Sequence, residues 1–166
     1  VSVIKVGATT EAEMKDKKLR LEDALNATRA AIEEGIIIGG GACLANVSSE
    51  VRNELRSDVL DVQKGINIVL DSLTAPLYQI AENAGYDGDE IVKKQLAEKE
   101  NVGFDAKNGK WVDMFEEGIV DPCKVTRSAL LNAASVSGLL ITTEAAVGSI
   151  KEKEPAMPAG GGMGMY

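Results

Sequence analysis

Two carboxylates and a run of glycines are the residues of this sequence whose types and spacing could do chemistry. Asp23 lies in a helical pattern, on a side away from the apolar stripe, and Asp121 stands directly before Pro122. Between them, the glycine run at 39–41 precedes a second helical pattern. A helix N-terminus attracts anions through its unpaired N–H groups and its positive dipole end. A carboxylate near a polyphosphate held there could orient a water molecule for in-line attack.

Each of these features also has a purely structural interpretation. An aspartate off the apolar face of a helix is usually a solvated surface residue. The glycine run lacks the lysine and hydroxyl of a P-loop, so it could equally be a flexible turn or a close helix contact. An aspartate before a proline often starts a helix, with Asp121 as the N-cap and Pro122 at the first helical position. A carboxylate at that place could also bind the diol of a ribose.

The elements that position these residues are expected to be mainly helices. Thr10 and Glu13 have the spacing of a capping box, which predicts a helix from about residue 11 to a glycine stop at Gly35. Apolar residues at helical spacing predict five further helices, with Asp58 as an N-cap of the second. Their expected ranges are 42–56, 58–74, 77–85, 89–99 and 122–148.

Strand signals are confined to two places. The β-prone residues of segment 1–8 predict a short strand. Asn108 and Gly109, between two apolar segments, predict a hairpin over residues 102–113. The segment 151–166 is a low-complexity tail rich in glycine and methionine, and we expect it to be disordered.

The composition argues against several classes of function. The chain has 166 residues, of which 45% are hydrophobic but only 4% aromatic, so its core must be aliphatic. A net charge of −8 argues against a nucleic-acid surface, and the lack of histidine removes that residue as a ligand or base. No stretch approaches the ~20 apolar residues of a membrane span. Cys43 and Cys123 form neither a zinc pattern nor a disulfide framework, and both are expected to be small buried or half-buried thiols.

Three long motifs, taken in order, resemble the C-terminal part of a group I chaperonin, the family of GroEL and the mitochondrial sixty-kilodalton heat-shock chaperonin. They are RLEDALNATRAAIEEGIIIGGGACL, LTAPLYQIAENAG and GIVDPCKVTRSALLNAASVSGLLITTEAAV, followed by the Gly/Met tail. The resemblance implies a mainly α fold: the helical half of the equatorial ATPase domain with a small β-hairpin, preceded by a strand and long helix of the intermediate domain. It implies three parts: residues 1–34 from the intermediate domain, 35–150 from the equatorial domain, and the tail 151–166.

The same resemblance assigns roles to individual residues. Asp23 matches the catalytic aspartate, which positions the attacking water. Gly40, Ile119 and Asp121 match nucleotide-binding positions, with Asp121 on the ribose. Asp105, Ala106 and Lys107 match the hairpin positions beside the adenine. The family commonly has Asn-Ala-Ala there, so the base contact is where this sequence departs from the pattern.

The implied function is that of a fragment of an ATP-dependent chaperonin that encloses and assists non-native proteins. The resemblance implies ATP or ADP with Mg²⁺, the magnesium ligand being expected upstream of Val1 and no metal site within these residues. Implied partners are copies of itself in seven-membered rings, a lid co-chaperonin and non-native polypeptides, with no nucleic acid and no membrane. The implied location is the bacterial cytoplasm, with the mitochondrial matrix as an alternative.

Two other functions remain open from the residues themselves. The first is a non-catalytic helical module for self-association, in which the acidic and glycine features are only caps and turns. The second is a small stand-alone enzyme, which the lack of histidine, of a metal cluster and of an activated nucleophile disfavours. On the chaperonin hypothesis, the fragment alone is expected to be nearly inactive as an ATPase.

Overall fold

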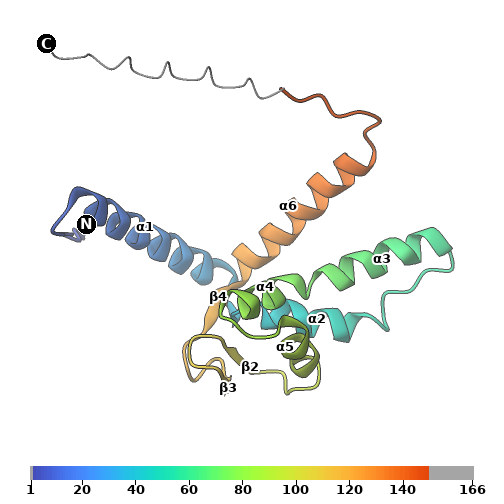
Figure 1. Cartoon of the computed structure of the whole chain (residues 1–166), viewed down its shortest axis with the longest axis horizontal. Helices are drawn as coiled ribbons and strands as arrows, with labels where there is room; N and C mark the ends of the chain where they lie inside the picture. Colours follow the sequence, from blue (N-terminus) through green and yellow to red (C-terminus); the bar gives the residue numbers. More distant parts are fainter. Residues whose placement is uncertain (1, 150–166) are drawn as a thin grey trace, which may run out of the picture. The chain divides into compact units, whose positions relative to one another are not determined.

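The computed structural model describes residues 2–149, and the chain divides into two compact units, Val1–Leu131 and Asn132–Tyr166. Figure 1 shows the elements of the chain. In order they are α1 (Glu11–Glu34), β1 (Ile36–Ile38), α2 (Ala42–Val51), α3 (Leu60–Ser72), α4 (Ala75–Asn83), α5 (Gly88–Gln95), β2 (Val102–Asp105), β3 (Lys110–Asp113), β4 (Val120–Pro122) and α6 (Cys123–Ile141). The prediction of a mainly helical chain with a hairpin is confirmed.

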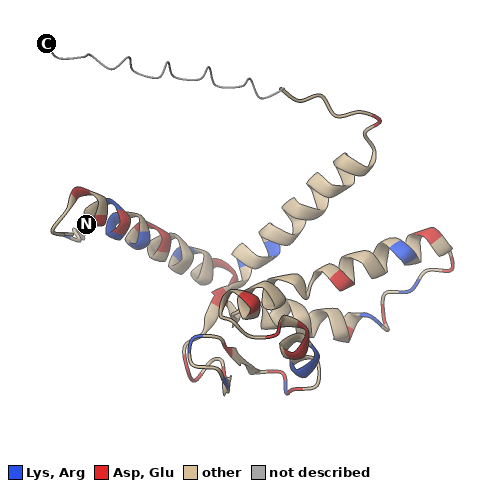
Figure 2. Ribbon diagram, viewed as in Figure 1, with Lys and Arg blue, Asp and Glu red and all other residues tan. Residues whose placement is uncertain are grey.

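The long helix α1 begins and ends where the sequence signals predict. The hydroxyl of Thr10 accepts a hydrogen bond from the N–H of Glu13 at 3.2 Å. Gly35 ends the helix with a φ of +83°, a conformation that glycine adopts without a steric penalty. Charged residues line the helix (Figure 2), and none of its residues is buried. Its position therefore depends largely on its C-terminal end, which packs against β4.

Two small antiparallel sheets hold together segments that are distant in sequence. β1 pairs with β4, and this register places Ile37 opposite Asp121. β2 pairs with β3 as a hairpin, with Phe104 opposite Trp111. Gly109 closes the hairpin turn with a φ of +66°, as an Asn-Gly signal predicts. The hairpin expected over residues 102–113 is thus confirmed, whereas the pairing of β1 with β4 had no sequence signal.

The core of the first unit consists of two small clusters. One contains Ala45, Leu77, Ala81, Ile91 and Phe104, and the other contains Ile38, Ala42 and Met114. Both alanines of α2 are fully buried, so this helix approaches its neighbours closely. These clusters place the start of α2 beside α4 and the hairpin, which is where the candidate site lies.

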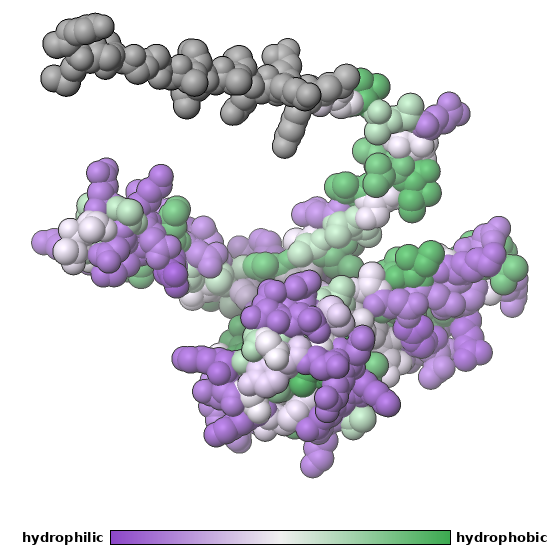
Figure 3. Space-filling model, in the orientation of Figure 1, coloured by the Kyte–Doolittle hydropathy of each residue, from purple (hydrophilic) through white to green (hydrophobic). Residues whose placement is uncertain are grey.

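Large apolar side chains remain exposed on helices of each unit. On α3, Leu60 and Ile68 are 68% and 69% exposed, and on the last turn of α6, Ile141 is 83% exposed. Figure 3 shows hydrophobic residues on the surface of both helices. Among residues 2–149, none of the helices combines the length and the apolar character that crossing a membrane requires.

Two predictions near the helix starts are wrong. Residues 2–8 form no strand, because none of the described segments offers them a hydrogen-bonded neighbour; Val1 lies outside the described residues. Asp58 is not the N-cap of α3, which has Val59 at that position. The hydroxyl of Ser57 accepts from the N–H of Val59, and the side chain of Gln63 accepts from the N–H of Ser57. These bonds form the turn in place of an aspartate cap.

Three further predictions also need correction. The helix expected over residues 42–56 ends at Val51, where the N–H of Glu54 turns back to the Val51 carbonyl. Asp121 is not an N-cap, because pairing with β1 draws Val120–Pro122 into a strand and α6 begins at Cys123. The same helix ends at Ile141 rather than near residue 148. Threonine hydroxyls that bind the carbonyls of the last turn follow directly (Thr142 and Thr143). The predicted tail, 151–166, lies outside the described residues.

Candidate functional site

The glycine run forms a tight turn between β1 and α2. Gly40 and Gly41 have φ values of +63° and +78°. A β-carbon on Gly41 would lie 2.6 Å from the backbone nitrogen of Leu77, and one on Gly39 would lie 3.1 Å from the carbonyl oxygen of Ile119. The turn therefore requires glycine for its backbone conformation and for space. The helix α2 follows at once, as the sequence predicts, and the N–H of its first residue, Ala42, donates to the carbonyl oxygen of Gly39 at 3.1 Å.

Ile119 and Asp121 lie directly beside the glycine turn. The N–H of Gly39 donates to the carbonyl oxygen of Ile119 at 2.9 Å, which continues the pairing of β1 with β4. Asp121 is half-buried, and this burial raises the pKa of its carboxyl group. Within residues 2–149 its carboxylate forms no ion pair. It is therefore free to accept hydrogen bonds from hydroxyl groups.

The end of β2 also lies close to the glycine turn. A β-carbon on Gly40 would lie 3.9 Å from the carbonyl oxygen of Phe104, the residue before Asp105. Ala106 packs against the core cluster of Phe104, while Lys107 is exposed. The carboxylate of Asp105 is engaged within its own turn, and the hydrogen bond from the side chain of Asn108 lowers its pKa. Three of the sequence-predicted segments thus meet around Gly40.

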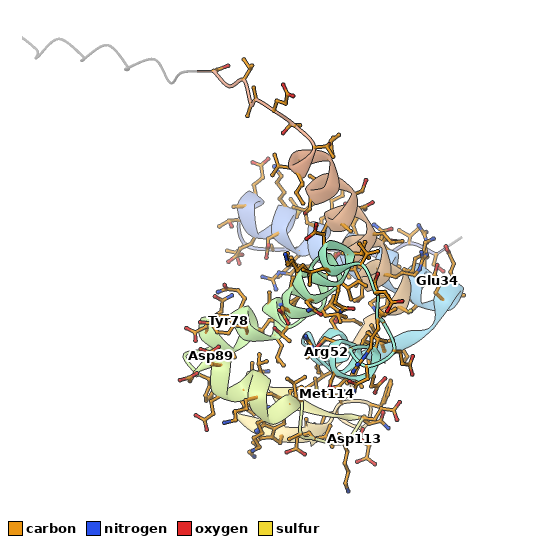
Figure 4. All side chains as sticks on the ribbon, turned by 90° about the vertical axis from the view of Figure 1, so that its right-hand side faces the viewer. Glu34, Arg52, Tyr78, Asp89, Asp113 and Met114 are labelled. Atoms are coloured by element: carbon orange, nitrogen blue, oxygen red, sulfur yellow. The ribbon has the colours of Figure 1, made fainter. Side chains whose placement is uncertain are left out.

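Met114 joins these segments, and the sequence interpretation did not single it out. It is fully buried, and its Cε lies 3.3 Å from a β-carbon placed on Gly40. A β-carbon on Gly103 of the hairpin would lie 2.9 Å from the same atom, and the Met114 carbonyl accepts from the N–H of Ile119 at 2.8 Å. Figure 4 shows where this side chain lies. No spacing signal could have found it, because a lone methionine after a strand resembles any core residue.

Asp23 does not lie with this cluster. It is exposed on α1 and precedes the last residue of the helix, Glu34, by eleven positions. At 1.5 Å per residue, that places it about 16 Å from the end of the helix that meets β4. Among the described residues, no ion pair joins Asp23 to the turn at Gly40.

Ion pairs hold the last turn of α1 against the start of α6. Glu34 accepts two hydrogen bonds from the guanidinium of Arg127, at 2.6 and 3.0 Å, and Glu33 pairs with Lys124. Glu34 lies at the C-terminal end of α1 (Figure 4). Its hydrogen bond to Arg127 lowers the pKa of the Glu34 carboxyl group and raises that of Arg127. These contacts flank Gly35, the residue about which α1 could turn.

Other features near the site carry no predicted residue. A pocket of about 170 Å³ is lined by β1, α2 and the segment before β2, and it includes Cys43 and Glu50. Both cysteines are free and partly buried, as expected, and burial raises the pKa of Cys43. In the part of the chain that the structure describes, no three side chains of His, Cys, Asp or Glu are grouped as a metal site would require.

Comparison with known proteins identifies relatives over nearly the whole chain. Residues 1–151 match the model of the TCP-1/cpn60 chaperonin family. The chain is 59% identical over 158 residues to a protein named chaperonin GroEL from Acholeplasma laidlawii, which covers 95% of this chain and 30% of the relative. It is also 59% identical over 154 residues to chaperonin GroEL of Onion yellows phytoplasma, covering 93% of this chain and 29% of the relative.

A solved structure agrees with these sequence matches. The crystal structure of a group III chaperonin in the open state superposes with a TM-score of 0.73 at 27% identity, covering 86% of this chain and 30% of that one. The chain therefore spans about 30% of the length of the curated relatives that it matches. The resemblance to group I chaperonins is confirmed by the identity to the two bacterial GroEL proteins. This chain belongs to the TCP-1/cpn60 chaperonin family, with the mainly α-helical fold of its equatorial domain.

Proposed function

We propose that this chain acts within an ATP-dependent chaperonin, where it carries the catalytic aspartate and one side of the nucleotide pocket. The parent polypeptide uses ATP hydrolysis to enclose and assist non-native proteins. The observation that carries this proposal is the meeting of three separate segments around Gly40: the glycine turn, the β4 segment with Ile119 and Asp121, and the end of β2. The resemblance to group I chaperonins implies nucleotide-binding residues in each of these segments.

The proposed roles follow from the chemistry of each position. Gly40 is proposed to contact the nucleotide through its backbone, in a conformation with a φ of +63° that favours glycine. The half-buried carboxylate of Asp121 accepts hydrogen bonds from the ribose diol. Ile119 provides an apolar surface for the base, opposite the hairpin segment of Asp105, Ala106 and Lys107.

Asp23 is proposed to position the water that attacks the terminal phosphate. In the described arrangement it lies about 16 Å along α1 from the helix end. We therefore propose that α1 turns about Gly35 when the site closes, and that hydrolysis is gated by this movement. The proposed division into an intermediate-domain segment, 1–34, and an equatorial segment, 35–150, places the hinge at the same residue.

The remaining parts of the machinery are proposed to lie elsewhere in the parent. The ligand of the Mg²⁺ that accompanies ATP is proposed to be in the other part of the polypeptide. The proposed partners are further copies in seven-membered rings, a lid co-chaperonin and non-native polypeptides. The proposed location is the bacterial cytoplasm, because the relatives reported above are bacterial.

The test uses a full-length chimera, in which this chain replaces the matching segment of the Acholeplasma laidlawii relative. Calorimetry of ADP binding is expected to show Asp121→Ala weakening affinity by about tenfold, the effect of losing charge-assisted hydrogen bonds. The matched control is Asp61→Ala, an exposed aspartate on α3 that pairs with Lys64. Equal affinities for the two variants, or no ADP binding by the unmodified chimera, would refute the proposal.

The alternative function is a non-catalytic helical module for self-association. The exposed apolar residues of α3 and α6 favour it, because such faces promote contacts between proteins. The two functions differ in their dependence on Asp121. Self-association is insensitive to Asp121→Ala, whereas nucleotide binding is not.

A further inference from the structure

The turn at the tip of the hairpin is folded by the carboxylate of Asp105. One oxygen, Oδ1, accepts hydrogen bonds from the backbone N–H groups of Lys107 and Asn108 at 3.0 and 3.2 Å. The other, Oδ2, accepts from Nδ2 of Asn108 at 2.6 Å. The carbonyl oxygen of Asp105 accepts from the N–H of Gly109 at 2.8 Å. Both carboxylate oxygens are thus directed into the turn.

Burial agrees with this arrangement. Asp105 is only 9% exposed, although residues 107–110, which follow it in the turn, are exposed. A carboxylate has roughly four acceptor positions, and three of them are occupied within the turn. Turning this side chain toward a ligand would leave the N–H groups of Lys107 and Asn108 without that acceptor.

The turn also lies where it can set the position of its neighbours. Phe104 is buried beside Leu77 and Ala45, and its carbonyl faces Gly40. Ala106 packs against the same cluster, so it is held between the core and the turn. The residues on either side of Asp105 are therefore fixed, while the carboxylate determines how the chain continues toward Lys107.

We propose that Asp105 is a positioning residue for the nucleotide base and does not itself contact it. Its carboxylate folds the 105–109 turn so that the backbone of Ala106 and Lys107 faces the base. This inference rests on the proposed function, because it concerns the same nucleotide site. An asparagine could fold the turn in the same way, since either side chain can accept from the two backbone N–H groups.

The two possible roles of Asp105 differ in base selectivity. A carboxylate that contacted the base would accept from the amino group of adenine and repel the carbonyl oxygen of guanine. A carboxamide could donate to that oxygen, so Asp105→Asn would then shift the ratio of ADP to GDP affinity by about tenfold or more. A carboxylate that only folds the turn leaves this ratio unchanged in both Asp105→Asn and Asp105→Ala.

The experiment measures ADP and GDP affinities of the full-length chimera by calorimetry. Asp105→Ala is expected to weaken both by about tenfold, because the turn loses its hydrogen bonds. Asp105→Asn is expected to retain most of the nucleotide affinity that Asp105→Ala loses. Asn108→Ala, which removes only the bond to Oδ2, is expected to weaken both nucleotides by about threefold.

A matched control separates positioning from general loss of stability. Asp113 folds a similar turn after β3, accepting from the N–H groups of Phe115 and Glu116 at 3.0 and 3.1 Å. Asp113→Ala is expected to lower the unfolding midpoint as Asp105→Ala does, without changing either affinity.

A changed ADP to GDP ratio in Asp105→Asn would overturn the inference, as would full ADP affinity in Asp105→Ala. Should Asp105→Ala fail to fold, the Asp105→Asn ratio and the Asn108→Ala affinities decide. Failure of the proposed function is recognised separately, by an unmodified chimera whose ADP binding is absent or insensitive to Asp121→Ala.

Discussion

At Asp121, the proposed role in ligand binding comes at a cost to the stability of the fold. The carboxyl group is half-buried without an ion pair among the described residues, and burial raises its pKa. The folded state therefore binds a proton more tightly than the unfolded state does, so ionisation of Asp121 destabilises the fold as the pH rises. A residue that weakens its own fold in this way is typical of a functional site.

The pH dependence of stability gives a direct check. Asp121→Asn is expected to be more stable than the unmodified chain at pH 7, and its advantage should shrink as the pH falls through the raised pKa of Asp121. Urea unfolding of both proteins at pH 4 to 7 measures the difference. An advantage that stays constant or grows at low pH would contradict the assigned burial cost.

Gly41 and Gly65 differ in whether their backbone conformation and their surroundings permit a side chain. Gly41 has a φ of +78°, and a β-carbon there would meet the backbone of Leu77 and Pro76. Gly41→Ala is expected to destabilise the chain by about 2–3 kcal/mol. Gly65, within α3, has open space around it, so Gly65→Ala is expected to stabilise by about 0.5–1 kcal/mol. Opposite signs in chemical unfolding support this account, and equal effects would contradict it.

At the scale of elements, the helix α1 is attached to the rest of its unit mainly through its last turn. Glu33 and Glu34 pair with Lys124 and Arg127, and Gly35 follows directly. Because the pKa of Glu34 is lowered, the stabilisation from this pair is present above the ordinary carboxylate pKa and lost as the pH falls. These ion pairs therefore restrain the direction of α1, and the restraint is reversible because it depends on ionised side chains.

Removing one of these ion pairs should make the last turn of α1 open more often. Arg127→Met is expected to speed amide hydrogen exchange in the last turn of α1 and at Gly35. Arg20→Met, which removes an exposed pair with Asp16 on the same helix, serves as control and should leave that turn unchanged. Identical exchange at Gly35 in all three proteins would show that the ion pairs do not restrain α1.

The elements that the sequence predicted correctly are those specified by local signals. Thr10, Gly35 and the Asn-Gly turn each act through neighbouring backbone groups, and the helix and hairpin they mark are present. The pairing of β1 with β4 joins residues far apart in sequence, so it overrode the helix-cap signal of Asp121. Met114 was missed for the same reason, because its importance lies only in contacts with Gly40 and Gly103.

For the whole molecule, the exposed apolar faces bear on how the chain behaves alone. Among the described residues, α3 and α6 leave large side chains uncovered. The chain also spans about 30% of the length of its curated relatives. We therefore propose that the nucleotide site becomes complete only within a longer polypeptide.

The isolated 166-residue chain should behave accordingly. It is expected to hydrolyse ATP negligibly and to self-associate through its uncovered apolar faces. Steady-state ATPase assays and sedimentation velocity measure the two properties, with the full-length chimera as reference. Turnover near that of the chimera would refute the dependence on a longer polypeptide.

The most direct test of the central claim measures ATP turnover and ADP binding together in the full-length chimera. Asp23→Ala is expected to lower turnover by about 10²-fold or more, the effect of losing a positioned catalytic group, while ADP affinity stays within about twofold. Asp16→Ala, seven residues earlier on the same face of α1, is the control and should turn over normally. Normal turnover in Asp23→Ala, or an equal loss of binding and turnover, would contradict the claim that a mobile helix brings this carboxylate to the nucleotide.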